Sequence, residues 1–117
     1  MRAVLPYLQH ILDAIGFIQT YTTAGRDAFH NDRKTQDAVI RNLEIIGEAV
    51  RNVPPDFQSA HAGIPWRQAA ELRNVLIHEY FGVDLNVVWA VVEKELPPLK
   101  ASIEQVVAKV NGGRHSA

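Results

Sequence analysis

Apolar residues recur three or four positions apart in every long segment of this chain, and this spacing constrains the fold more than any other feature. Such spacing places side chains on one face of an α-helix, and no segment alternates as a β-strand would. The apolar faces are formed by Leu5, Leu8, Leu12 and Ile15, then Val39, Leu43, Ile46 and Val50, then Leu85, Val88, Val92 and Leu96, and finally Leu99, Ile103, Val106 and Val110. We therefore predict an all-α protein, an antiparallel bundle of four or five helices.

Residues that start and stop helices divide the first half of the chain. We predict a first helix over residues 6–22 and a short turn capped by Asp27. The second long helix should begin after the cap Asn31 or Asp32 and end at Val53-Pro54-Pro55. Gly47 lies in its middle, where glycine costs roughly 1 kcal/mol relative to alanine, so we expect a neighbour to approach closely there. We predict a polar loop over residues 54–64.

The second half of the chain carries similar signals. Pro65-Trp66 should open the third helix, which ends near Gly82. Asp84 should cap the fourth, and the two prolines at 97 and 98 must bend or restart it. We expect one helical domain over residues 1–111 and a flexible C-terminal tail over residues 112–117.

Composition narrows the class of protein. The chain has 117 residues, 47% of them hydrophobic, enough for one domain with one core. Its net charge of −1 argues against a general nucleic-acid coat protein. It has no cysteine, and therefore neither disulfides nor thiolate metal sites. We recognise no signal peptide and no run that could span a bilayer, so we expect a cytoplasmic protein without a membrane partner.

The third predicted helix gathers the residues with useful chemistry. At 100° per residue, Asn74 and His78 lie one turn apart on a polar arc. Arg73 lies about 140° from His78 around the helix, a gap that a long arginine stem can partly bridge. His78 could act as a general acid or base near neutral pH. Arg73 could bind a phosphate through two parallel hydrogen bonds and stabilise developing charge.

Each of these residues also has a structural interpretation. His78 could merely cap the helix end near Gly82, and its position alone favours that interpretation. Arg73 could equally form a salt bridge with Glu44 or Glu48 of the second helix, and the carboxylate could then also orient the guanidinium. Tyr80 is an aromatic residue just before a helix stop, where such residues usually pack in the core.

Other familiar sites are not supported. Glu44 and Glu48 could suggest a metal site, but Arg41 and Arg51 are spaced to neutralise them. A zinc-protease pattern beginning at His78 would need a histidine at position 82, which is glycine. Phosphate-binding glycine loops and nucleophile elbows do not occur, and we expect no cofactor. What remains is an acid–base group and a cation, the parts required for metal-free cleavage of RNA.

The segment Arg73-Asn74-x-x-x-His78-x-Tyr80 resembles the Arg-x4-6-His motif of the HEPN superfamily, in the form found in HepT-like toxins. The likeness extends to the flanks, which are similar to that family's segments around the motif. These flanks are the block 43–49, Ile64-Pro65-Trp66, the run 80–84 and Val88-Trp89. The resemblance covers the chain from the first helix to about residue 110.

This resemblance implies a homodimeric endoribonuclease that is the toxin of a toxin–antitoxin pair, with an MNT-type nucleotidyltransferase as antitoxin. His78 would be the acid–base residue, Arg73 would stabilise the phosphate, and Asn74 would orient one of them or hold the phosphate. The 2′-hydroxyl of RNA would attack the adjacent phosphorus, and the motifs of two subunits would face each other. The antitoxin would silence the toxin by transferring AMP to Tyr80.

One alternative function stays open at this point. The same fold could be a non-catalytic accessory or substrate-binding subunit of a nucleotidyltransferase. In that case Arg73 and His78 would only grip a nucleotide or the partner protein.

Overall fold

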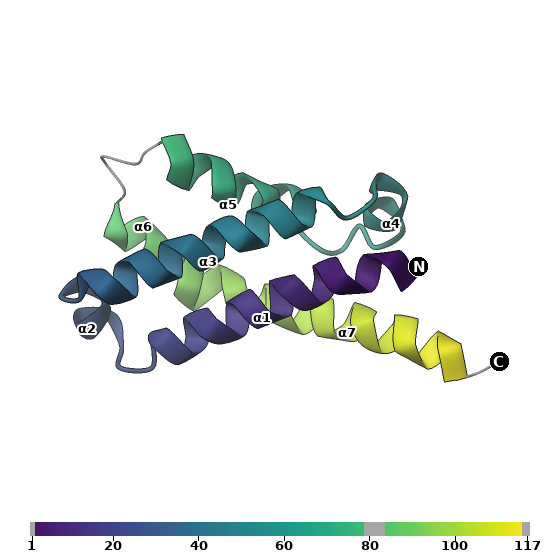
Figure 1. Cartoon of the computed structure of the whole chain (residues 1–117), viewed down its shortest axis with the longest axis horizontal. Coiled ribbons are helices and arrows are strands. Elements are labelled where there is room, and N and C mark those ends of the chain that lie inside the picture. Colours follow the sequence, from purple (N-terminus) through teal and green to yellow (C-terminus); the bar gives the residue numbers. More distant parts are fainter. Residues whose placement is uncertain (1, 79–83, 116–117) are drawn as a thin grey trace.

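The computed structural model describes residues 2–78 and 84–115, with the side chains of residues 3–73 and 84–111. No strand occurs in these residues, which confirms the predicted all-α class. The elements, shown in Figure 1, are a short 3-10 turn η1 (Arg2–Val4), α1 (Leu5–Tyr21), α2 (Arg26–His30), α3 (Arg33–Arg51), α4 (Pro55–Ala60), α5 (Trp66–His78), α6 (Leu85–Ala90), the π-helical segment η2 (Val91–Glu95) and α7 (Leu96–His115).

The long helices pack as an antiparallel bundle, as predicted. Helix α1 packs against both α3 and α7, and α5 packs against the opposite side of α3. Consecutive long helices run in opposite directions, which gives an elongated body of 51 × 28 × 20 Å (Figure 1). None of the described helices is both long and apolar enough to cross a membrane.

The core is formed by the apolar faces read from the sequence. Each buried aliphatic side chain contributes about 1.5–3 kcal/mol relative to leaving it exposed, so these faces hold the helices together. Side chains with almost no exposed surface include Leu8, Ile11, Ile15 and Ile18 of α1, Val39, Leu43, Ile46 and Val50 of α3, and Leu96 and Ile103 of α7.

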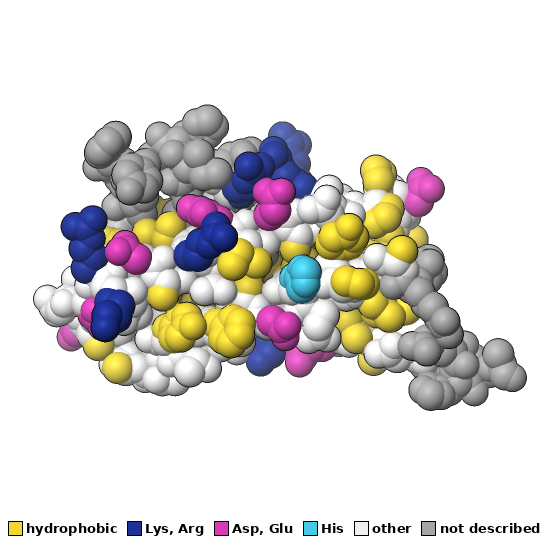
Figure 2. All heavy atoms as spheres, viewed as in Figure 1, with side chains coloured by type: hydrophobic (Ala, Val, Ile, Leu, Met, Phe, Trp, Pro, Cys, Tyr) yellow, Lys and Arg dark blue, Asp and Glu magenta, His cyan; other side chains and the backbone are white. Residues whose placement is uncertain are grey.

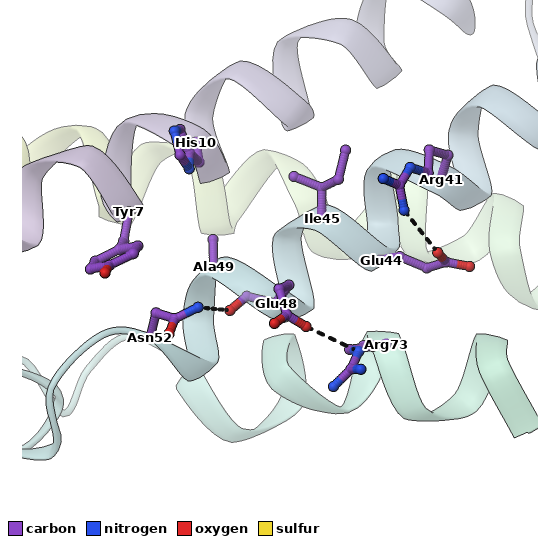
Figure 3. Close-up of a pocket in the computed structure, with 9 residues that line it drawn as sticks. All are labelled: Tyr7, His10, Arg41, Glu44, Ile45, Glu48, Ala49, Asn52 and Arg73. Atoms are coloured by element: carbon purple, nitrogen blue, oxygen red, sulfur yellow. Dashed lines mark hydrogen bonds and ion pairs between the residues drawn. The ribbon is translucent and has the colours of Figure 1, made fainter.

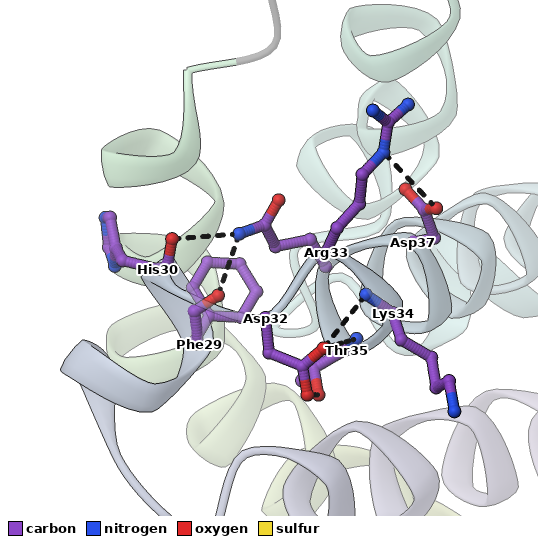
Figure 4. A network of polar contacts seen from close by, with 8 residues as sticks. Phe29, His30, Asp32, Arg33, Lys34, Thr35 and Asp37 are labelled. Atoms are coloured by element: carbon purple, nitrogen blue, oxygen red, sulfur yellow. Dashed lines mark hydrogen bonds and ion pairs between the residues drawn. The ribbon is translucent and has the colours of Figure 1, made fainter.

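The start of α3 is fixed by the predicted cap Asp32. Its carboxylate accepts hydrogen bonds from Lys34 N at 3.0 Å and from Thr35 Oγ1 at 2.8 Å (Figure 4). The hydrogen bond from the Thr35 hydroxyl lowers the pKa of the Asp32 carboxyl below its ordinary value. The preceding α2 is capped by Gly25 rather than by Asp27. Gly25 has a φ of 95°, a conformation that favours glycine.

The loop predicted over residues 54–64 is partly wrong, because it contains α4. Pro55 occupies the first turn of this helix, where its missing N–H costs little. Phe57 is buried from α4, and its ring lies 6.3 Å from that of Trp66, measured between centroids. Trp66 Nε1 donates a hydrogen bond to the His61 carbonyl at 3.0 Å. These tertiary contacts stabilise a helix of only six residues, too short to show a periodic pattern.

The fourth predicted helix begins at its expected cap, because Asp84 accepts a hydrogen bond from Asn86 N at 2.9 Å. The prediction that the prolines bend or restart this helix is also confirmed. The π-helical turn η2 precedes them, and Pro97 and Pro98 lie in the first turn of α7. Proline rings clash with the carbonyl four residues earlier in a regular α-helix, and a wider turn relieves this clash. Helix α7 reaches His115, past the boundary expected at residue 111, and flexibility of the tail stays a prediction.

Candidate functional site

Helix α5 holds Arg73 against α3 at a point of very close approach. A Cβ atom added to Gly47 of α3 would lie 2.7 Å from Arg73 Cβ and 2.9 Å from Arg73 N. Real Cβ atoms essentially never come so close, and one of the two contacts is with backbone. Glycine at position 47 therefore lets α5 pack this close to α3. This explains the glycine inside α3 and confirms the expected close approach.

Arg73 forms an ion pair across the two helices. Its Nε lies 3.1 Å from Glu48 Oε2, and the two side chains are 35% and 58% exposed. One of the two carboxylates proposed from the sequence is therefore its partner. The pair uses Nε, and the terminal nitrogens of the guanidinium lie on the side away from Glu48 (Figure 3). A guanidinium has five N–H donors, so one held through Nε can still offer a fork to a second anion.

An open hollow of about 500 Å³ lies beside this ion pair, between α1 and α3. Arg73 enters it from α5, so three helices contribute to one site (Figure 3). Arg41 and Glu44 form a second ion pair there, with Nη1 and Oε2 3.5 Å apart. The complete lining is Tyr7, His10, Arg41, Glu44, Ile45, Glu48, Ala49, Asn52 and Arg73.

This lining combines groups suited to a nucleotide. Two guanidinium groups can bind phosphate, and Tyr7 and His10 add rings that a base can contact. Neither Tyr7 nor His10 was predicted from the sequence as a site residue. Their polar groups, which interrupt an otherwise apolar helix, were the one sequence feature that could have indicated it. A helix alone does not reveal that its polar face lies beside an arginine sixty residues later.

The remaining predicted site residues fall beyond the described side chains. Asn74 and His78 lie on α5, one and five residues after Arg73, and their side chains are outside the described part. Tyr80 lies outside the described residues altogether. A regular helix places His78 about 7.5 Å along the axis from Arg73, so both belong to one end of α5. The convergence of their side chains stays a prediction.

The described residues hold no cluster of metal ligands. No group of three or more His, Asp or Glu side chains there comes together in a way that could hold a metal ion. Glu44 and Glu48 are each paired with an arginine instead. Glu48 pairs with Arg73 of α5, whereas the sequence suggested Arg51 as a neutralising partner on its own helix.

The fold and this hollow define a small helical protein with an ion-paired arginine at the edge of an open hollow. Comparison with known proteins identifies its family: the chain belongs to the HepT-like family, whose profile, described as "Ribonuclease HepT-like", matches residues 11–106. This confirms the resemblance seen in the sequence.

Individual relatives agree with this assignment. A Thermococcus cleftensis protein named "Probable ribonuclease HepT" is 48% identical over 106 residues, which are 90% of this chain and 96% of that protein. A Caldanaerobacter subterraneus protein named "Putative RNase" is 39% identical over 110 residues, 93% of this chain and 98% of the relative.

A third relative is longer than this chain. The Methanocaldococcus jannaschii protein named "Gamma-glutamylcyclotransferase and putative RNase" is 43% identical over 111 residues. These residues are 94% of this chain but only 50% of that protein, so the chain spans half of its length. No solved structure matches the chain.

Proposed function

We propose that this protein is an endoribonuclease that cleaves RNA without a metal ion and acts as the toxin of a toxin–antitoxin pair. The observation that carries the proposal is Arg73, a cation held in an open hollow by Glu48 and followed on the same helix by His78. Membership of the HepT-like ribonuclease family, with relatives named as ribonucleases over nearly their whole length, supports this activity.

The proposed reaction uses the RNA's own nucleophile. A 2′-hydroxyl attacks the adjacent phosphorus, and the bond from phosphorus to the 5′-oxygen breaks. The products are a 2′,3′-cyclic phosphate and a 5′-hydroxyl. The 2′-hydroxyl loses one proton and the leaving 5′-oxygen gains one, so the reaction needs an acid–base group and consumes no water. We assign proton transfer to His78, because imidazole titrates near neutral pH.

Arg73 would stabilise the charge that builds on the phosphate oxygens. A planar guanidinium matches two such oxygens, and its charge does not depend on pH in the working range. Glu48 orients this guanidinium through Nε, so Arg73 can form its salt bridge and bind a phosphate at the same time. We assign Asn74 to the same phosphate, or to the orientation of Arg73 or His78.

We further propose a homodimer. Arg73 and His78 are about 140° apart on a regular helix, and a twofold axis could bring Arg73 and His78 motifs of two subunits together. A largely apolar hollow of about 240 Å³ between α5 and α6 supports a partner there. Its apolar lining is Leu43, Leu72, Val87, Val88 and Val91, with Gln68, Glu71 and Glu95 as polar neighbours. Val87 is 52% exposed.

Purified protein and a labelled RNA test the assigned roles. His78→Ala should lower the cleavage rate about 10²–10⁴-fold, as loss of a general acid or base typically does. Arg73→Lys keeps the charge but loses the fork, so its activity should also fall. The matched control is Arg67→Lys, because Arg67 lies on the same helix and pairs with Glu71 on the surface. Equal cleavage by Arg73→Lys and wild type would remove the proposed role of the guanidinium fork.

The proposed regulation is transfer of AMP to Tyr80 by a nucleotidyltransferase antitoxin. A phenol with an ordinary pKa of about 10 is a poor base at neutral pH, so Tyr80→Phe should keep much of the ribonuclease activity. Modification would add a phosphate seven residues after Arg73, where it could pair with the guanidinium.

Mass spectrometry of the protein co-expressed with the antitoxin tests this regulation. Wild type should gain roughly 329 Da for each AMP, whereas Tyr80→Phe should gain nothing and stay toxic. Neutralisation of Tyr80→Phe as complete as that of wild type would mean inhibition by binding alone, and would favour the accessory-subunit alternative.

A further inference from the structure

Two aromatic rings are exposed on α1, outside the hollow. Phe17 and Tyr21 lie one helical turn apart, with ring centroids 6.3 Å apart and planes inclined by only 15°. Their side chains are 53% and 44% exposed. Nearly all other large apolar side chains of the described part are covered, Val87 being the third exception. A pair of parallel, exposed rings is suited to a flat ligand.

These rings continue the face of α1 that lines the hollow. From His10, Phe17 is seven residues and Tyr21 eleven residues further, so each ring points within about 20° of the direction of His10 around the helix. Along the helix the rings lie about 10.5 Å and 16.5 Å beyond the level of His10. At roughly 3.4 Å per stacked nucleotide, Phe17 is about three nucleotides from the hollow that holds Arg73.

Basic side chains flank this stripe. Helices α1 and α3 are antiparallel, and Figure 3 shows His10 of α1 opposite Ala49 of α3. Equal rise along both helices then puts Arg41 near the level of Phe17, and Lys34 about four residues past the level of Tyr21. Figure 2 shows hydrophobic side chains over the C-terminal half of α1, and both basic and acidic side chains over the neighbouring α3.

Two of the nearby carboxylates are paired with arginines. Asp37 lies 3.9 Å from Arg33 and Glu44 lies 3.5 Å from Arg41, whereas Asp13 accepts a hydrogen bond from the neutral Gln9 amide and keeps its charge. The Arg41 side chain is 72% exposed. An ion pair so exposed contributes little stability, so a phosphate can take the place of its carboxylate. The face thus offers aromatic rings for bases and cations for a backbone.

We propose that Phe17 and Tyr21 form a stacking platform for unpaired bases of single-stranded RNA, next to the scissile phosphate at Arg73. This inference rests on the proposed ribonuclease function and names the form of RNA it takes. Aromatic side chains beside a basic groove are how proteins hold single strands without reading their sequence. Double-stranded RNA would not fit, because its bases are stacked on one another and closed to side chains.

The size of the surface favours bases over a protein partner. Two rings, each about half exposed, offer on the order of 200 Å², whereas a stable protein interface needs about 800 Å² from each partner. Polar Asp13 and Thr20 border the rings on α1. The apolar hollow proposed for a second subunit is lined from α3, α5, α6 and the π-helical segment, and not from α1.

Binding should be measured apart from cleavage. The probe is a fluorescent single-stranded RNA of eight nucleotides with 2′-O-methyl groups, which lack the attacking hydroxyl. The variant is the double substitution Phe17→Leu with Tyr21→Leu, which keeps apolar bulk but removes both rings. Loss of one stacked base corresponds to about 5- to 150-fold weaker binding, so the dissociation constant should rise by at least about fivefold. Ser59→Ala, an exposed position on α4 that lines neither hollow, is the control and should bind like wild type.

Substrate length provides a second readout. A dinucleotide that spans only the scissile phosphate cannot reach the rings, so wild type and double variant should cleave it equally. An unmodified octanucleotide should show a raised KM in the double variant with an unchanged kcat. Binding of the octanucleotide within twofold of wild type by the double variant would overturn the platform.

Three further outcomes distinguish the stacking platform from the ribonuclease function and from a dimer contact. A wild type that binds the methylated octanucleotide but cleaves no RNA would refute the ribonuclease function and leave the platform standing. A wild type that binds no single-stranded RNA would refute both. Light scattering should give about twice 13.1 kDa for wild type and double variant alike. A double variant that becomes monomeric would assign the rings to a second subunit and overturn the inference.

Discussion

At the scale of single residues, the site depends on how Arg73 is held. The sequence left open whether Arg73 forms a salt bridge or binds a phosphate. In the structure both are compatible, because Glu48 contacts Nε while the terminal nitrogens point away from Glu48. Arg41 and Glu44 form a comparable pair within α3, also at the edge of the hollow. Only the first pair involves the helix that carries the family motif, and its arginine is the less exposed of the two. This difference allows a matched comparison.

Glu48→Gln should lower ribonuclease activity more than it lowers stability. The ion pair is partly exposed, so its loss should change the free energy of unfolding by no more than about 1 kcal/mol. The guanidinium would lose its orienting charge, and kcat should fall with little change in KM. Glu44→Gln is the control, because it removes a carboxylate from the same helix without touching Arg73. Equal activity of the two variants would show that Glu48 does not position Arg73.

At the scale of helices, the contact between α3 and α5 sets the depth at which Arg73 lies. Gly47 makes this contact possible, and Ala70 of α5 also borders it, with its carbonyl oxygen 3.2 Å from a Cβ built at position 47. Helix propensity alone would favour alanine at position 47 by roughly 1 kcal/mol. The glycine is therefore explained by packing and by the position of the arginine, not by the local helix.

Gly47→Ala should lower both the melting temperature and the activity. Overpacking of a tight contact typically costs about 1–3 kcal/mol, which exceeds the gain in helix propensity, and α5 must shift together with Arg73. Gly16→Ala in α1 is the control. A Cβ there meets nothing within 4 Å, so this substitution should raise the melting temperature slightly and leave activity unchanged. Thermal unfolding of both variants decides the matter. A stabilised and fully active Gly47→Ala would contradict the role given to this contact.

At the scale of the whole molecule, the sequence predicted the features that depend on residue spacing and residue type within a single helix. The apolar faces of α1 and α3, the caps Asp32 and Asp84 and the close approach at Gly47 are all present. The sequence did not predict α4, which is stabilised by the burial of Phe57. Nor did it predict the five residues that α1 and α3 contribute to the hollow alongside Arg41, Glu44 and Glu48. Both depend on contacts between distant segments, which periodicity does not encode.

The same distinction applies to the proposed chemistry. Arg73 could be recognised from its motif, and its ion partner could be narrowed to two carboxylates of α3. The choice between Glu44 and Glu48 required the register of α5 on α3. The role of α1, with Tyr7 and His10 in the hollow, required knowing which face of the molecule Arg73 reaches.

Analysis of the cleavage products tests the central claim most directly. Purified wild-type protein should be incubated with single-stranded RNA in excess EDTA, and the termini of the products should be identified by mass spectrometry. We expect cleavage to persist and to leave 2′,3′-cyclic phosphate and 5′-hydroxyl ends, because His78, Arg73 and the 2′-hydroxyl supply every required group. Loss of cleavage in EDTA with recovery on addition of Mg²⁺, or products with 3′-hydroxyl and 5′-phosphate ends, would contradict it.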